Sequence, residues 1–147
     1  LLQPRSRGRV TLASADPAAA PLVDPAFFSD PDDMQRMVRG VRRMREILAQ
    51  PALASLGARE LPHSSRAQSD AQIEQFIRDW ADTIYHPVGT CRMGCGPLDV
   101  VDAQLRVHGL QALRVVDASI MPRIVSGNTN APTVMIAEKA VDMLLKK

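Results

Sequence analysis

The sequence predicts an α+β fold, and three observations support that class. Residues 9–13 alternate between polar and apolar side chains, which is the period of a β-strand. Two segments, about 31–49 and about 70–82, repeat apolar residues at the spacing of an amphipathic helix. Short apolar segments and a third helix follow after residue 100 without regular alternation, so the pattern is α+β rather than α/β.

The N-terminal part is expected to hold one strand followed by an ordered connector. Val10 and Leu12 form the apolar face of the strand, which we therefore expect to be half-buried. Prolines between residues 17 and 31 then favour extended backbone and turns. Apolar residues such as Leu22 and Val23 anchor this stretch, so we predict an ordered segment rather than a disordered one.

Both central helices begin with capping signals. Asp30 can cap the first helix, and the proline after it suits the first turn. Ser69 and Gln72 form a capping box at the start of the second helix. The segment 50–68 between the helices is expected to be irregular, with His63 in an exposed loop. The apolar stripes expected to face a core are Met34, Met37, Val38, Val41, Met44, Ile47 and Leu48 in the first helix and Ile73, Phe76, Ile77 and Trp80 in the second.

The C-terminal part is expected to hold two short strands and a final helix. The strand candidates, separated by a turn, are Leu105–Val107 and Ala112–Val116. Residues 121–130 are expected to form a loop, and the helix to occupy about 132–146 with Pro132 in its first turn. The early turns of this helix are apolar nearly all round, so we expect it to need protein on several sides.

Length, charge and composition exclude several classes of protein. The 147 residues suit one domain with a core of its own. The net charge is +2, from 18 basic and 16 acidic residues, and only 3% of the residues are aromatic, so a nucleic-acid-binding protein is not expected. No apolar run is long enough for a transmembrane helix, and the first residues lack the order of a signal peptide.

The two cysteines, Cys91 and Cys95, lie close together in the sequence. They cannot supply a disulfide framework, which indicates a reducing compartment, and we expect a cytoplasmic protein. A zinc site could recruit His86 and His108 as well, but the spacing matches no common zinc pattern. We therefore expect no metal and keep a zinc protein as a minor alternative.

Two segments are unlike ordinary core or loop. In the first, Pro87 holds His86 in an extended conformation, and the glycines that follow let the backbone approach a flat ligand. Such a histidine is either a general base or a hydrogen-bonded core residue. In the second, residues 126–133 lead into the last helix, whose start stabilises negative charge. Asn130 in this segment is either a helix cap or a contact for a ligand.

Four stretches in this order resemble the C-terminal portion of the glucose–methanol–choline (GMC) oxidoreductases, close to the choline and alcohol dehydrogenase branch. They are LLQPRSRGRVTLASADP, YHPVGTCRMG, LRVVDASIMP and SGNTNAPTVMIAEKAVDML. The resemblance implies an enzyme that oxidises an alcohol CH–OH group by proton abstraction and hydride transfer to FAD. It also implies that residues 1–110 belong to the substrate-binding domain, and that residues 111–147 are a strand, loop and helix completing the FAD-binding domain.

The resemblance also assigns roles to individual residues. His86 of the HP motif is expected to remove the hydroxyl proton of a small alcohol, and Asn130 to orient the alkoxide. Four further residues are expected to lie against FAD: Asp117, Ala118, Pro132 and Thr133. The start of the last helix would then point at the pyrimidine end of the flavin, where reduction leaves negative charge.

The phosphate-binding GxGxxG loop of this family has no counterpart in the 147 residues. We therefore expect a fragment or natural truncation without the N-terminal FAD domain, which by itself is inactive, retains little FAD and self-associates. The full-length protein is expected to be an FAD-dependent alcohol dehydrogenase or oxidase, either freely soluble or peripheral at a membrane. The alternative is a stand-alone, non-catalytic binding or interaction domain that kept the fold. The substrate alcohol and the electron acceptor stay open.

Overall fold

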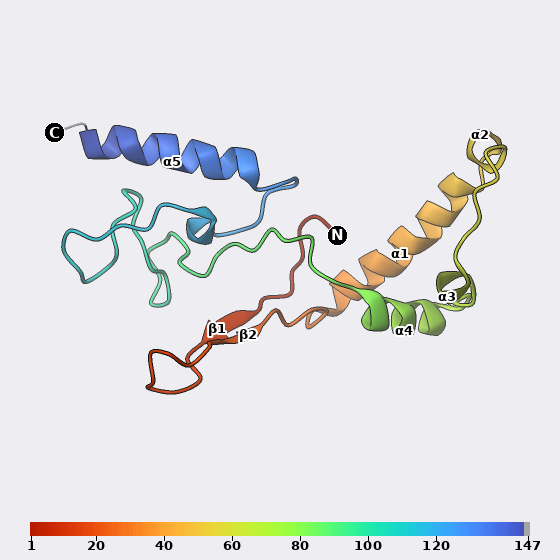
Figure 1. Ribbon diagram of the computed structural model, residues 1–147, viewed down its shortest axis with the longest axis horizontal. Helices are drawn as coiled ribbons and strands as arrows, with labels where there is room; N and C mark the ends of the chain where they lie inside the picture. Colours follow the sequence, from red (N-terminus) through yellow and green to blue (C-terminus); the bar gives the residue numbers. More distant parts are fainter. Residues whose placement is uncertain (146–147) are drawn as a thin grey trace. The chain divides into compact units, whose positions relative to one another are not determined.

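The computed structural model describes residues 1–145, which form two compact units (Figure 1). The first unit contains Gln3–Gly8 and Asp24–Thr83, and the second contains Arg9–Val23 and the chain from Ile84 onwards. Each unit has its own cluster of buried apolar residues. Helices and short strands occur together, which confirms the α+β class. The expected domain boundary at residue 110 concerns the full-length protein and stays a prediction.

The longest helix of the first unit is α1 (Pro31–Leu48). Asp30 caps it as predicted, because its carboxylate accepts the amide of Asp32 at 2.9 Å. The apolar stripe is buried at the start of the helix, where Met34 and Val38 lie in the core. The stripe is exposed at the other end, where the exposed fraction of Leu48 is 47%. Only the first half of the predicted stripe therefore contributes to the core of this unit.

The helix α4 (Asp70–Trp80) packs against α1 and begins with the predicted capping box. The Ser69 hydroxyl accepts the amide of Gln72 at 3.3 Å, and Gln72 Oε1 accepts the amide of Ser69 at 3.0 Å. Ile73 and Ile77 are buried in the same cluster as the apolar residues of α1. The caps therefore account for where the two helices begin, and the apolar periodicity accounts for the faces that pack together.

The segment 50–68, expected to be irregular, contains two single-turn helices, α2 (Pro51–Ala54) and α3 (Pro62–Ser65). Each begins with a proline, whose fixed φ suits the first helical position, and the sequence-based prediction overlooked this signal. His63 on α3 is exposed as predicted, but its ring stacks on that of Trp80, with centroids 4.7 Å apart. Trp80 itself is 63% exposed and so lies outside the buried stripe of α4.

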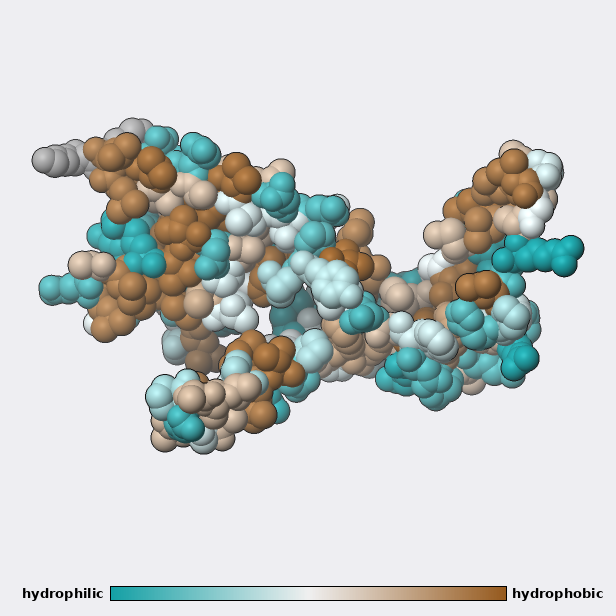
Figure 2. Space-filling model, in the orientation of Figure 1, coloured by the Kyte–Doolittle hydropathy of each residue, from teal (hydrophilic) through white to brown (hydrophobic). Residues whose placement is uncertain are grey.

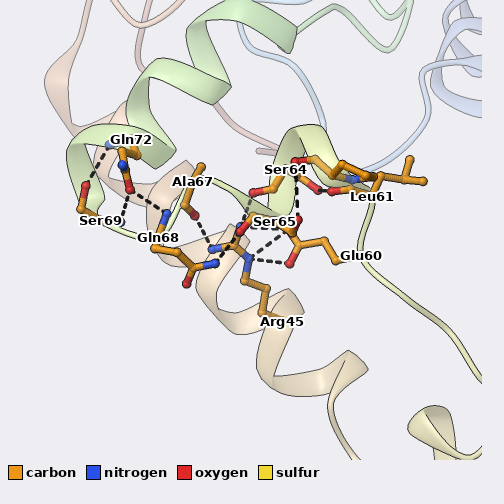
Figure 3. Close-up of polar contacts among 10 residues, drawn as sticks. Arg45, Glu60, Leu61, Ser64, Ser65, Ala67, Gln68, Ser69 and Gln72 are labelled. Atoms are coloured by element: carbon orange, nitrogen blue, oxygen red, sulfur yellow. Dashed lines mark hydrogen bonds and ion pairs between the residues drawn. The ribbon is translucent and has the colours of Figure 1, made fainter.

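Arg45 joins α1 to the segment around α3 (Figure 3). Its guanidinium donates to the carbonyl oxygens of Ser64 at 2.7 Å and Ala67 at 2.8 Å, and pairs with the Glu60 carboxylate at 2.8 Å. The hydrogen bond from Arg45 lowers the pKa of the Glu60 carboxyl below its ordinary value, against an opposing effect of burial. One side chain thus satisfies acceptors on both sides of α3.

The chain also forms a two-stranded sheet of β1 (Arg9–Thr11) and β2 (Leu22–Asp24), and all of it except Asp24 belongs to the second unit. The first strand was predicted, whereas β2 was expected only as part of the connector. The expectation of a half-buried strand is wrong, because both strands are exposed and Val10 and Leu12 are 48% and 85% exposed. Within residues 1–145 the two strands pair only with each other, and every residue of both strands is exposed.

The prediction of regular strands at Leu105–Val107 and Ala112–Val116 is wrong. These segments are joined by one isolated bridge, between Arg106 and Arg114, rather than by a continuous ladder. The backbone supplies the reason: Leu105 and Ala112 have φ values of 65° and 57°, which interrupt an extended chain at the start of each segment. The apolar side chains still reach the core of this unit, where Leu105 is 3% exposed.

The helix α5 (Asn130–Leu145) begins slightly earlier than predicted and keeps Pro132 in its first turn. Ile136 and Ala140 are buried in the core of the second unit. Other apolar residues of α5 remain exposed, and Figure 2 shows hydrophobic surface along this helix. They are Val134, Met135, Val141, Leu144 and Leu145. No helix in the described part of the chain is both long and apolar enough to cross a lipid bilayer.

Candidate active site

The backbone around His86 is constrained on both sides. Tyr85, directly before it, has a φ of 64°. This left-handed conformation costs a residue with a side chain roughly 1–2 kcal/mol. Gly89 has a φ of 89°, and a Cβ at this position would lie 3.3 Å from the carbonyl oxygen of Met121. The glycine therefore allows both the turn after His86 and the close approach of the segment that contains Met121.

The imidazole of His86 is half-buried and contacts the loop before α5. Its Nδ1 lies 3.0 Å from Oγ1 of Thr129, a residue 43 positions further along the chain. Thr129 is itself buried, with 8% of its surface exposed. Within residues 1–145 no protein group contacts Nε2 of His86 by a hydrogen bond, so this nitrogen is available to a ligand. A neutral imidazole with one engaged and one available nitrogen can act as a general base.

Hydrogen bonds attach the HP segment to the short 3₁₀ helix η1 (Ala118–Ile120). The amide of Cys91 donates to the carbonyl oxygen of Ser119 at 3.0 Å, and the amide of Met93 donates to that of Ile120 at 2.8 Å. The HP and VVDAS motifs, far apart in the sequence, are thereby held side by side. The helix η1 in turn packs against α5, so all three segments of the candidate site belong to one unit.

Asp99 closes the glycine-rich loop that follows the HP segment. Its carboxylate accepts a hydrogen bond from the Arg92 side chain and another from the amide of Gly96, the latter at 2.6 Å. These two bonds, the Arg92 bond foremost, lower the pKa of the Asp99 carboxyl below its ordinary value. His108 Nε2 lies 2.9 Å from the carbonyl oxygen of Gly94. Unlike that of His86, the Nε2 of His108 is therefore engaged by the protein.

The residues expected to lie against FAD occupy two neighbouring elements. Asp117 caps η1, with its carboxylate accepting the amide of Ser119 at 2.8 Å, and Ala118 is the first residue of that helix. Pro132 and Thr133 are in the first turn of α5. Since η1 packs against α5, the fold brings the two pairs into one region of the second unit. Their contact with FAD stays a prediction.

The start of α5 fits a flavin ring chemically. The first amides of a helix lack partners within the helix, and with the helix dipole they favour a ligand that gains negative charge. Val134 and Met135, in the same region, are 53% and 57% exposed and offer apolar surface to a planar group. Thr133 is committed to the helix, because its hydroxyl donates to the carbonyl oxygen of Thr129 at 2.6 Å. Its contribution to such a site would therefore be mainly steric.

The helix boundary changes the interpretation of Asn130. Because α5 begins at Asn130, the residue before the helix is Thr129, and Asn130 does not occupy the cap position that one alternative gave it. The side chain of Asn130 is exposed. The contact of Thr129 with His86 brings this loop against the imidazole, while convergence of the His86 and Asn130 side chains on one ligand stays a prediction.

Thr129 is the site residue that sequence analysis missed. A hydroxyl residue directly before a helix is ordinarily explained as a cap, so nothing in the pattern pointed to a histidine. Concerning metals, both Cys91 and Cys95 are free thiols. No group of three histidine, cysteine, aspartate or glutamate residues gathers as a cation site within the described chain.

A single enzyme family accounts for this arrangement. The model of the GMC oxidoreductase C-terminal domain matches residues 4–137, and the chain belongs to this family. An alcohol dehydrogenase [acceptor] of Pseudomonas putida is 51% identical over 99% of this chain and 26% of its own length. An oxygen-dependent choline dehydrogenase of Pseudomonas savastanoi pv. phaseolicola is 50% identical over 95% of this chain and 24% of its own length. The chain thus spans about a quarter of these relatives.

Solved structures agree with the sequence comparison. Pyridoxine 4-oxidase from Mesorbium loti is 38% identical, with a TM-score of 0.86 over 96% of this chain and 28% of that protein. An FAD-dependent oxidoreductase from Chaetomium thermophilum is 32% identical, with a TM-score of 0.88 over 99% of this chain and 25% of that protein. Both similarities extend through the two units described above, which confirms that the chain has the C-terminal GMC fold.

Proposed function

We propose that this chain supplies the general base for FAD-dependent oxidation of an alcohol CH–OH group within a full-length GMC oxidoreductase. The observation that carries the proposal is the environment of His86. Its Nδ1 is engaged by Thr129 at 3.0 Å, and its Nε2 is left for a substrate hydroxyl. In the reaction, Nε2 takes the hydroxyl proton as the hydride leaves the carbinol carbon. A well-placed base of this kind contributes roughly a hundred- to ten-thousandfold to the rate.

Asn130 is proposed to assist at the same oxygen. Its exposed side chain follows Thr129 directly, so its backbone lies one residue from the contact with His86. An amide N–H can donate to the alkoxide that forms when the proton leaves, and so stabilise the developing charge. For both groups to serve one oxygen, each must reach it at about 2.6–3.2 Å.

FAD is proposed as the cofactor, held partly by Asp117, Ala118, Pro132 and Thr133. When bound, it supplies the two-electron oxidant that receives the hydride. The chemistry of the α5 start and the exposed apolar residues beside it support this assignment. The Chaetomium thermophilum relative named above is described as FAD-dependent, which supports the same cofactor for the full-length protein.

The substrate class proposed is a small alcohol. The named relatives include an alcohol dehydrogenase and a choline dehydrogenase, and the substrates of both carry a hydroxyl group on carbon. The alternative of a stand-alone, non-catalytic domain is not favoured, because residues 4–137 match an enzyme family. A cytoplasmic location is retained as part of the proposal.

Replacement of His86 in the full-length, FAD-loaded protein tests the proposal. We expect His86→Ala to slow anaerobic reduction of the flavin by an alcohol by roughly a hundredfold or more, with the flavin still bound. Stopped-flow absorbance measures the reduction, and the flavin-to-protein ratio measures binding. His63→Ala, which removes an exposed histidine of the first unit, is the matched control. An unchanged rate in His86→Ala would remove His86 from the mechanism.

A further inference from the structure

The side chain of Thr129 is placed unusually for a residue before a helix. A threonine in this position normally turns its hydroxyl towards the free amides of the first helical turn. Here Oγ1 lies 3.0 Å from Nδ1 of His86, and the residue is 8% exposed. Other hydrogen bonds hold the local backbone. The Thr129 carbonyl oxygen accepts the amide of Thr133 at 3.0 Å and the hydroxyl of Thr133 at 2.6 Å. The hydroxyl is therefore presented to the imidazole from a fixed helix start.

The role of Nε2 depends on which group donates the hydrogen in this contact. In a neutral histidine, one ring nitrogen carries the hydrogen and the other accepts, and the partner of one nitrogen decides the role of the other. If the Thr129 hydroxyl donated to Nδ1, the hydrogen would sit on Nε2, and Nε2 could not accept a proton. If Nδ1–H donates to Oγ1, Nε2 carries the lone pair that a base requires.

The accepting role of Thr129 also suits both charge states of His86. Protonated histidine is a donor at both nitrogens. A hydroxyl that already accepts from Nδ1–H keeps the same bond when Nε2 gains its proton. A hydroxyl that donates to Nδ1 would have to reorient, because Nδ1 would then carry a hydrogen. The accepting arrangement therefore requires no reorganisation of Thr129 during proton transfer.

We propose that Thr129 is a positioning residue, which holds the imidazole of His86 with its hydrogen on Nδ1 and with Nε2 as the proton acceptor. The proposal rests on the proposed function, in which His86 is the base. The constrained backbone at Tyr85 and Gly89 sets where the ring is attached. The remaining freedom is rotation of the ring and the choice of tautomer. The contact with Thr129 restricts the rotation, and the proposal assigns to it the Nδ1–H tautomer.

The tautomer can be measured directly in the full-length, FAD-loaded protein. Selective ¹⁵N labelling of histidine and NMR of the ring nitrogens distinguish an Nδ1–H ring from an Nε2–H ring, and His86→Gln assigns the signals. We expect His86 to carry its hydrogen on Nδ1 in the unmodified protein. Thr129→Val keeps the shape but removes the hydroxyl, and should shift the ring towards Nε2–H. Thr129→Ser should retain the Nδ1–H form.

Flavin reduction provides the second measurement. We expect Thr129→Val to slow reduction by an alcohol about two- to tenfold, the range that loss of one ordinary hydrogen bond produces. Thr129→Ser should restore most of the rate, and the flavin-to-protein ratio should not change. Thr11→Val, the same substitution on the exposed strand β1, serves as the control and should leave both the tautomer and the rate unaltered.

The outcomes separate this inference from the proposed function. An Nε2–H ring in the unmodified protein would overturn the inference and Nε2 as the accepting atom, while loss of reduction in His86→Ala would still support His86 as the base. This measurement does not depend on any Thr129 variant folding. An Nδ1–H ring and an unmodified rate in Thr129→Val would also overturn it, by showing that the hydroxyl is dispensable. If His86→Ala reduces its flavin normally, the proposed function fails instead.

Discussion

The carboxylate of Asp33 accepts the backbone amide of Ser6 at 2.7 Å across 27 positions of the chain. It also accepts the amide of Arg5 at 2.9 Å, Arg36 lies 3.7 Å away, and Asp33 is only 1% exposed. Burial raises the pKa of Asp33, but the hydrogen bonds from Ser6 and Arg5 and the charge of Arg36 outweigh it. The net pKa therefore lies below 3.8, the ordinary value. A buried carboxylate thus fastens the N-terminal segment to α1.

Asp33→Asn should lower the free energy of unfolding by about 1–3 kcal/mol at neutral pH, because the buried amides lose a charged acceptor. A depressed folded pKa gives stability that is complete above the unfolded pKa and is lost as pH falls through the folded pKa. The difference in the free energy of unfolding between the unmodified protein and Asp33→Asn should therefore become smaller below about pH 4. Urea unfolding at several pH values measures this, with the exposed Asp79→Asn on α4 as control. Equal stability at neutral pH would contradict the prediction.

Arg45→Met should destabilise the first unit by about 1–3 kcal/mol, because two carbonyl oxygens and a carboxylate lose their donor together. Arg45→Lys should recover little, since an ammonium cannot reproduce the planar guanidinium fork. Arg43→Met is the matched control: its pair with Glu46 is 73% and 60% exposed, so a change below about 0.5 kcal/mol is expected. Thermal and urea unfolding of the three variants measures these losses. A loss of stability in Arg43→Met as large as that in Arg45→Met would contradict the prediction.

Two glycine substitutions should have opposite effects on stability. Gly89→Ala places a Cβ at a φ of 89° and 3.3 Å from the Met121 carbonyl oxygen, and should cost about 1–2 kcal/mol. Gly40→Ala lies inside α1 with nothing within 4 Å of the new Cβ, and should stabilise by about 0.5–1 kcal/mol. Unfolding midpoints measured side by side test the pair. A stabilised Gly89→Ala protein would show that the turn after His86 is less constrained than its geometry indicates.

The 147-residue chain alone should bind FAD weakly or not at all. The glycine loop that normally holds the pyrophosphate has no counterpart in this sequence, and the α5 start is proposed to contact only one end of the flavin. Absorbance of the purified chain, followed by titration with added FAD, measures retention and affinity. A yellow preparation with one flavin per chain would show that these residues suffice for binding.

The isolated chain should also self-associate through α5. Several apolar residues of this helix are half or more exposed, and exposed apolar patches of several hundred square ångströms generally drive association. Light scattering over a concentration series should show a mass above 16.1 kDa. Val141→Lys combined with Leu144→Lys should lower that mass, whereas Leu56→Lys in the first unit should not. A monomer at all concentrations would refute the prediction.

Local signals in the sequence predicted the three long helices correctly. Asp30 and the Ser69–Gln72 pair are caps, and α1 and α4 follow the apolar periodicity between them. They succeed because a capped amphipathic helix depends on residues within a few positions of one another. The strand predictions after residue 100 failed because extended pairing depends on partners elsewhere in the chain, and positive φ values at Leu105 and Ala112 break those segments.

By itself, the sequence determined the family, the three long helices and the candidacy of His86, because motifs and periodicity are properties of neighbouring residues. Only the tertiary structure decided that Trp80 is exposed, that Arg45 joins α1 to the α3 segment, and that Thr129 contacts His86. A contact between residues 43 positions apart depends on how a loop, η1 and α5 pack against one another. That packing is a cooperative result of the whole core, and no local pattern encodes it.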